Sequence, residues 1–257
     1  MRYTVRLSYD GSKFSGWQKQ KNAKSVQEEL SKALSILFGD ETEAVGAGRT
    51  DTGVNAVNYI AHFDTPSDEV YDTARISYKL NAILPKSISI HEIKPVCKDF
   101  HARFSALSRE YHYFIHFNKD PFMESFSYHC RYGLDIGKMN EGASYLLGEH
   151  DFSCFEKAGG NNATSICTVY EAVWEKYVPS HVSAMGFPSA DGDYIVFRIR
   201  ANRFLRNMVR AIVGTLINIG RGKAEPESIR SLIASRNRSN AGESVPGKAL
   251  FLSEVKY

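Results

Sequence analysis

The chain has 257 residues, of which 43% are hydrophobic and 24% are charged, and its formal net charge is +3. These values suit one large globular domain or two medium ones, and the mildly basic balance allows nucleic-acid binding without requiring it. No apolar run approaches the roughly 20 residues of a membrane helix, and strand-like sequence begins at once without a signal peptide. We therefore expect a cytoplasmic protein with no membrane partner. The four cysteines are widely spaced and form no zinc motif.

Strand-like and helical patterns alternate through the first part of the chain. Ser25 and Glu28 form a capping box ahead of apolar residues at helical spacing, and Gly39 is placed to end that helix. Alternating apolar and polar residues predict half-buried strands, and Pro85 limits a second helix. In chain order, we expect a strand over 3–9, a helix from 26 to 39, a strand over 57–63, a helix over 69–82 and a strand over 88–93.

A second series of elements follows residue 104. Gly148 is placed to cap one helix, and Pro226 is expected at the first position of another. Glycine-rich or proline-bounded stretches at 158–163 and 179–192 predict loops. The elements expected are strands over 111–117, 170–177, 194–201 and 250–255, and helices over 139–147, over 204–219 and after Pro226.

Because strands and helices are interleaved and many connections look like hairpins, we predict an α+β fold with helices packed on mixed, mainly antiparallel sheets. The two series of elements meet near residue 105 without a flexible linker. We therefore expect two halves, 1–105 and 106–257.

The segment Gly48-Arg49-Thr50-Asp51-Thr52-Gly53 carries the clearest chemical signal. In an extended segment Arg49 and Asp51 face the same side, and a nearby cation favours the ionised carboxylate that a nucleophile or base needs. The alternative is an ordinary turn in which Gly53 supplies a positive φ. Gly46-Ala47-Gly48 lacks the third glycine of a dinucleotide-binding motif, which argues against a nucleotide cofactor.

Two further groups of residues could contact an anionic or aromatic ligand. Arg203, Arg206 and Arg210 fall on one stripe of the helix expected over 204–219, where cations near its N-terminus oppose the macrodipole unless an anion binds there. A solvated basic face is the alternative. Tyr111 and Tyr113 share a strand face and could either pack in the core or stack on a base.

Together these segments resemble the tRNA pseudouridine synthase A family, and the matching blocks are collinear along nearly the whole chain. The aspartate loop at 48–54 and the arginine block at 204–210 are the specific ones. The other blocks are Tyr9-Asp10-Gly11 with Gly16-Trp17-Gln18, the stretches 108–113 and 148–152, and the closing residues 250–252 and 255–257.

The resemblance implies an enzyme that isomerises uridine to pseudouridine in the anticodon stem-loop, at positions 38–40 of the tRNA, using no cofactor and no metal. It implies a homodimer whose subunits both contact one tRNA, built from two α/β halves whose sheets join across a central active-site cleft. By the same resemblance Asp51 is the catalytic carboxylate, Tyr111 is the active-site aromatic and Arg210 pairs with the aspartate. The candidate substrate-binding residues are Arg49, Arg203, Arg206, Lys19, Lys21 and Leu250.

The chain departs from the family pattern at Asn55 and Asn207, where histidine is common. Two other functions remain open from the residues themselves. One is a non-catalytic RNA-binding protein, although a carboxylate facing polyphosphate would weaken its binding. The other is a hydrolase that uses Asp51 with His62 or His150 as an acid–base pair, although Gly148–Phe152 could equally be a helix-capping turn.

Overall fold

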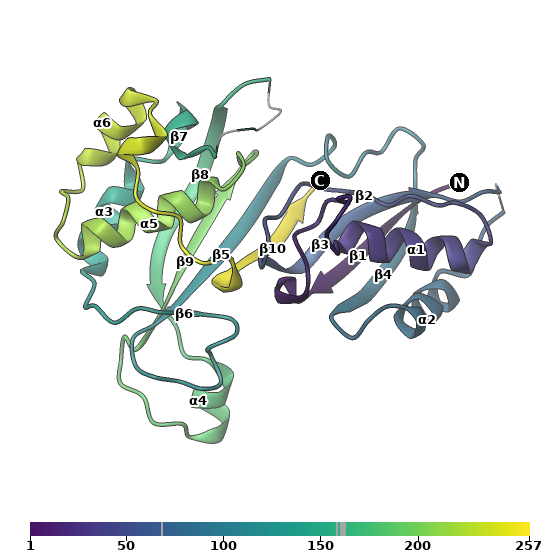
Figure 1. Ribbon diagram of the computed structural model, residues 1–257, viewed down its shortest axis with the longest axis horizontal. Coiled ribbons are helices and arrows are strands. Elements are labelled where there is room, and N and C mark those ends of the chain that lie inside the picture. The colour runs from purple at the N-terminus through teal and green to yellow at the C-terminus, as the bar shows by residue number, and fades with distance from the viewer. Residues whose placement is uncertain (68, 158, 160–162) are drawn as a thin grey trace. The chain divides into compact units, whose positions relative to one another are not determined.

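The computed structural model describes residues 1–67, 69–157, 159 and 163–257, so the loop expected at 158–163 lies largely outside the described residues. The chain divides into two compact units (Figure 1). The first unit is Met1–Leu107 with Phe251–Tyr257, and the second is Ser108–Leu250. Within the described ranges the chain forms six α-helices and ten strands, and most strand pairs are antiparallel. The predicted α+β class is confirmed.

The first unit is a sheet with two helices on one face (Figure 1). β1 pairs with β4 on one side and with β3 on the other, both antiparallel, and β10 joins β3 in parallel. The closing strand of the chain therefore belongs with the first unit's sheet. The strands of this sheet are β1 (Arg2–Tyr9), β2 (Val45–Gly46), β3 (Asn55–Asp64), β4 (Ile88–Val96) and β10 (Leu250–Lys256).

Local sequence explains the elements of this unit. Alternate residues of β1 are buried, as its period of two predicts. Helix α1 (Val26–Phe38) begins where the Ser25 side chain accepts the Glu28 N–H, and it ends at Gly39 in the left-handed conformation. Helix α2 (Thr73–Ile83) begins four residues later than predicted, because the Asp72 side chain caps it. A short 3-10 turn, η1 (Gly11–Lys13), follows β1.

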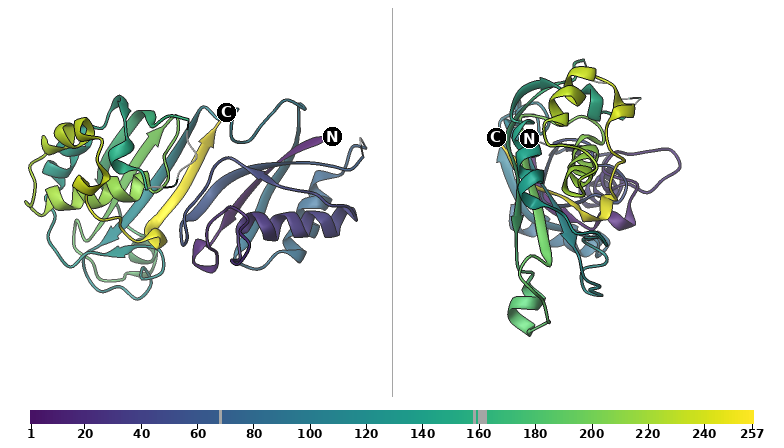
Figure 2. Two further views of the ribbon diagram at one scale, coloured as in Figure 1. Left: turned by 45° about the horizontal axis from the view of Figure 1, so that its top comes forward. Right: turned by 90° about the vertical axis from the view of Figure 1, so that its left-hand side faces the viewer.

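The second unit is an antiparallel sheet in the order β5-β9-β8-β7, with the short β6 parallel to β5. Helices α3 and α5 lie on one face of this sheet (Figure 2). The strands are β5 (Ser108–His116), β6 (Tyr128–His129), β7 (Gly148–Asp151), β8 (Ile166–Lys176) and β9 (Tyr194–Ala201). The α-helices are α3 (Ile136–Ser144), α4 (Ser180–Met185), α5 (Met208–Gly220) and α6 (Ser228–Ser235). The 3-10 helices are η2 (Ser153–Phe155), η3 (Arg238–Asn240) and η4 (Gly247–Ala249).

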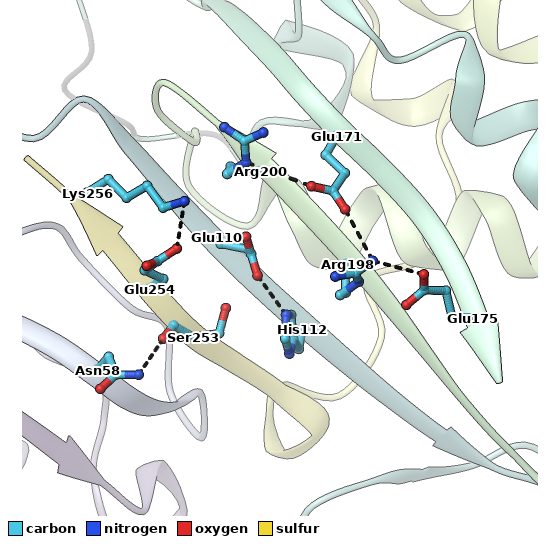
Figure 3. A network of polar contacts seen from close by, with 10 residues as sticks. All are labelled: Asn58, Glu110, His112, Glu171, Glu175, Arg198, Arg200, Ser253, Glu254 and Lys256. Atoms are coloured by element: carbon cyan, nitrogen blue, oxygen red, sulfur yellow. Dashed lines mark hydrogen bonds and ion pairs between the residues drawn. The ribbon is translucent and has the colours of Figure 1, made fainter. Parts of the chain in front are cut away.

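The strands β5, β8 and β9 of the second unit carry a network of polar contacts (Figure 3). Glu110 on β5 lies 2.8 Å from Nε2 of His112 on the same strand. Arg198 on β9 bridges two carboxylates of β8, at 3.4 Å from Glu171 and 2.9 Å from Glu175. The contacts of Arg198 align side chains across the neighbouring strands β8 and β9.

Several predicted boundaries in the second unit are wrong. The helix expected over 139–147 begins earlier, because Asp135 caps it, and it ends at Ser144. Gly148 does not cap that helix; it has φ of 94° and starts β7, which pairs with β8, so the helix-capping turn expected there is a strand. The loop expected over 179–192 contains α4, and the helix expected from Pro226 begins two residues later.

Candidate active site

Asp51 lies in the connection between β2 and β3 of the first unit. The N–H of Val54 donates to the carbonyl of Asp51 at 3.1 Å, and Gly53 has φ of 77°, which closes a tight turn just after the carboxylate. The segment thus forms the ordinary turn that was one interpretation of its sequence, and this turn does not exclude the other interpretation, a reactive Asp51. Thr50 is buried, Asp51 is half-buried and Arg49 is exposed. This alternation directs Thr50 inward and Arg49 with Asp51 outward.

Aromatic and amide side chains from neighbouring elements hold the Asp51 loop. The hydroxyls of Tyr9 and Thr50 are hydrogen-bonded at 2.9 Å, and Oδ1 of Asn55 accepts the Gly11 N–H at 2.8 Å. The Tyr59 hydroxyl donates to the carbonyl of Gly48. Reasoning from sequence missed these contacts, because the residues lie up to 44 positions apart along the chain.

Lys19 and Lys21 lie on the connection between η1 and α1, and both are exposed. The backbone N–H of Lys19 donates to the Gln27 side chain at 3.0 Å, which ties this connection to α1. Lys21 lies in the tight turn closed by the bridge between Gln20 and Ala23. Their exposure leaves both ammonium groups in solvent on the surface of the first unit.

Tyr111 lies on β5 of the second unit and is 8% exposed. Its ring meets the Phe204 ring edge to face, with centroids 5.1 Å apart. Tyr113 is on the same strand face, as expected, and is fully buried. Burial raises the pKa of Tyr113 well above its usual value, and its protonated hydroxyl donates to the carbonyl of Pro246 at 3.1 Å. Tyr113 is thus a core residue, whereas Tyr111 lies at the edge of that core.

The predicted helical stripe of three arginines is wrong. Helix α5 begins at Met208, so Arg203 and Arg206 lie in the preceding loop. The helix cannot extend further back, because Asn207 has φ of 65°, in the left-handed region. Only Arg210 lies in the first turn of α5.

The contacts of these arginines differ. Nε of Arg210 donates to the carbonyl of Val245 at 2.7 Å, which fixes its stem against the segment that precedes η4. Arg206 is exposed, and its carbonyl accepts the Lys157 N–H at 3.0 Å. Arg203 is half-buried beside Asn202, whose side chain accepts the Thr168 N–H at 2.9 Å.

Leu250 is the first residue of β10 and is 4% exposed. It follows η4 directly, so the segment that contacts Arg210 and Tyr113 leads into it. Its side chain is packed in the interior, where an apolar residue contributes by burial.

The two histidines suggested for a hydrolase, His62 and His150, are each hydrogen-bonded to the backbone. His62 on β3 is 4% exposed, and its Nδ1 accepts the Ala102 N–H at 3.1 Å. Burial lowers the pKa of His62 to about 4, so it is neutral at physiological pH. His150 lies on β7 of the second unit, where Nε2 donates to the carbonyl of Leu147 at 2.9 Å. His62 is therefore buried and neutral, which is not the environment of a general acid or base.

In the parts of the chain that the structure describes, no three His, Cys, Asp or Glu side chains gather in a way that could hold a metal ion. Over those same ranges, every helix is too short or too polar to cross a membrane.

Comparison with known proteins connects these features to one family. Residues 7–105 and 143–257 match the family described as tRNA pseudouridine synthase. The chain belongs to the tRNA pseudouridine synthase family. It is 44% identical over 256 residues to tRNA pseudouridine synthase A of Bacteroides thetaiotaomicron, covering all of this chain and 90% of that protein. The protein of the same name from Bacillus subtilis is 39% identical over 261 residues, covering all of this chain and 99% of its own length.

Family membership covers both groups of candidate residues. The first matched segment contains the Asp51 loop, and the second contains Arg203, Arg206 and Arg210. Tyr111 lies in the stretch between the two matched segments, although the full-length relatives extend across it. Membership in the tRNA pseudouridine synthase family therefore agrees with the resemblance drawn from the sequence blocks.

Proposed function

We propose that this protein isomerises uridine to pseudouridine in the anticodon stem-loop of tRNA, with Asp51 as the catalytic carboxylate. The observation that carries the proposal is the Asp51 loop. Asp51 is half-buried in a tight turn, and the preceding residue, Thr50, is buried and hydrogen-bonded to Tyr9. Membership in the tRNA pseudouridine synthase family supports the reaction class. The names of relatives that match the whole chain support tRNA as the substrate.

The reaction needs a carboxylate but no electron carrier. The bond from ribose C1′ to uracil N1 breaks, and a bond from C1′ to C5 forms. C5 loses its proton and N1 gains one, so the product is an isomer of the substrate. Asp51 acts either by adding to C6 of the uracil or by removing a ribose proton to give a glycal-like intermediate. In both routes its ionised form is the reactive one, and Arg210 stays the candidate partner of Asp51 that the sequence resemblance implies.

Substrate binding divides between an aromatic residue and cations. A uridine in a stem must leave the base stack, at a cost of a few kcal/mol. Tyr111 is the candidate to replace the lost stacking, because its ring lies at the edge of the second unit's core. Arg203, Arg206 and the exposed Lys19 and Lys21 are the candidates for phosphate contacts. We further propose that the protein acts as a homodimer in which one tRNA contacts both subunits.

Tritium release from tRNA labelled at uracil C5 tests this function directly. Wild type should release tritium, and Asp51→Asn should release none while it still binds tRNA. Asp72→Asn is the matched control, because it makes the same chemical change in the same unit at a helix cap where asparagine serves as well as aspartate. Turnover by Asp51→Asn within tenfold of wild type would remove the catalytic role from Asp51.

The alternative of a non-catalytic RNA-binding protein gives a different result in the same assay. Tight tRNA binding with no tritium release by the wild type would favour it. Sedimentation velocity with and without tRNA tests the homodimer, and a single monomeric species under both conditions would contradict it.

A further inference from the structure

The loop that carries Asp51 is fixed from both sides by one short segment of the chain, residues 9–11. On the near side, the Tyr9 hydroxyl is hydrogen-bonded to the hydroxyl of Thr50, the residue before Asp51, at 2.9 Å. On the far side, the Gly11 N–H donates to Oδ1 of Asn55 at 2.8 Å. Tyr9, Thr50 and Asn55 are 4%, 7% and 2% exposed, so both contacts are shielded from water.

The packing around these contacts leaves little room for the loop to move. A Cβ added at Gly11 would lie 2.1 Å from the carbonyl oxygen of Val54, so the two segments touch backbone to backbone. The Trp17 N–H donates to the carbonyl of Thr50 at 3.3 Å. The ring of Tyr9 packs against those of Trp17 and Tyr59, with centroids 6.3 and 5.7 Å away. The Tyr9 ring is thus held by packing, and the Tyr9 hydroxyl is hydrogen-bonded to the Thr50 hydroxyl.

We infer that Tyr9 and Asn55 are positioning residues that set the direction of the Asp51 carboxylate through Thr50 and Gly11. The inference rests on the proposed catalytic role of Asp51. Its physical basis is that a displacement of about 1 Å at a reacting group can lower a rate by about a hundredfold without changing substrate binding. Buried hydrogen bonds on both sides of a turn restrict such displacements.

The chemistry of the contact suits an asparagine at position 55. The Gly11 N–H needs only an acceptor, and the carboxamide oxygen of asparagine provides one at 2.8 Å. Asn55 therefore places a buried acceptor opposite the Gly11 N–H.

The test compares kcat for tRNA with the dissociation constant for tRNA in Tyr9→Phe. This variant keeps the ring and its packing and removes only the hydroxyl. We expect kcat to fall about ten- to a hundredfold with an unchanged dissociation constant. Thr50→Val, which removes the other hydroxyl at constant size, should give the same loss. Thr50→Ser should retain most of the activity, and combining Tyr9→Phe with Thr50→Val should add little to either single loss.

Tyr71→Phe is the matched control. Its hydroxyl is hydrogen-bonded to the Ser67 hydroxyl at 2.9 Å, so it removes the same kind of contact elsewhere in the first unit. Asn55→Leu, which keeps the branching of the side chain without an acceptor, should behave like Tyr9→Phe. Circular dichroism establishes that each variant is folded at the assay temperature.

The outcomes separate this inference from the proposed function. If Asp51→Asn is inactive and Tyr9→Phe lowers kcat no more than Tyr71→Phe does, the positioning role is overturned while the catalytic role stands. A parallel loss of tRNA affinity in Tyr9→Phe would also overturn it, because the residue would then shape the binding surface. If Asp51→Asn is active, the proposed function fails at that step and the inference fails with it.

Discussion

The buried His62 should make the stability of the first unit depend on pH. The residue is 4% exposed, and burial, helped by the charges of Arg2 and His101, lowers its pKa from 6.5 to about 4. Between pH 6.5 and about 4, the unfolded chain therefore binds a proton at His62 that the folded chain does not bind. Because the folded pKa is the lower one, the stabilisation is complete above pH 6.5 and is lost as the pH falls toward 4.

The size of this effect follows from the two pKa values. At pH 5 the unfolded histidine is almost fully protonated, about 1.5 pH units below its pKa, while the folded one is mostly neutral. Each unit corresponds to about 1.4 kcal/mol, so the free energy of unfolding should be about 2 kcal/mol lower at pH 5 than at pH 7.5 on account of His62 alone.

Urea denaturation of wild type and His62→Asn at the two pH values isolates this contribution. The asparagine oxygen can accept the Ala102 N–H in place of Nδ1 and does not titrate. The fluorescence of Trp17 reports on unfolding of the first unit. Both proteins carry Trp174→Phe, which removes the fluorescence of the other tryptophan. Wild type should lose about 2 kcal/mol more than His62→Asn on acidification. Equal losses in the two proteins would refute the reasoning.

Three further predictions concern a strained residue, a helix cap and a surface cation. Asn207→Ala should lower the free energy of unfolding by about 1 kcal/mol more than Asn207→Gly, because only alanine resists φ of 65°; equal losses in urea would show that the strain is relieved. Ser25→Ala should cost about 1 kcal/mol in the same assay, through loss of the oxygen that caps α1 at Glu28, and a neutral result would contradict that role. Arg206→Ala should reduce the slope of log affinity for tRNA against log salt by about one, measured by filter binding; an unchanged slope would exclude a phosphate contact.

The elements that sequence reasoning predicted well are those with local signals. The alternation in β1 and the capping box of α1 each specify an element within about a dozen residues, and the structure follows them. The elements that it missed depend on distant partners. β7 is four residues long and is a strand because it pairs with β8, so His150 lies opposite Cys167 instead of in a capping turn.

The candidate site divides in the same way. The glycines around Asp51 and the turn that they form are visible in six consecutive residues, so the loop could be predicted as a unit. Its supports could not, because Tyr9 and Asn55 are ordinary residues of strand-like stretches until the fold brings them to Thr50 and Gly11. A tyrosine hydroxyl gives no sequence signal of its partner.

The late start of α5 changes the physical interpretation of its arginines. Apolar spacing from Phe204 onward is compatible with a helix, but the Asn207 side chain bonds to the Ser244 hydroxyl at 2.6 Å and its backbone takes the left-handed conformation. Arg206 is therefore presented by a loop, with its carbonyl held by the Lys157 N–H, and not by a helix face. Arg210 alone lies in the first turn of α5, so the stripe of three cations on one helix face, from which a bound anion was predicted, does not exist.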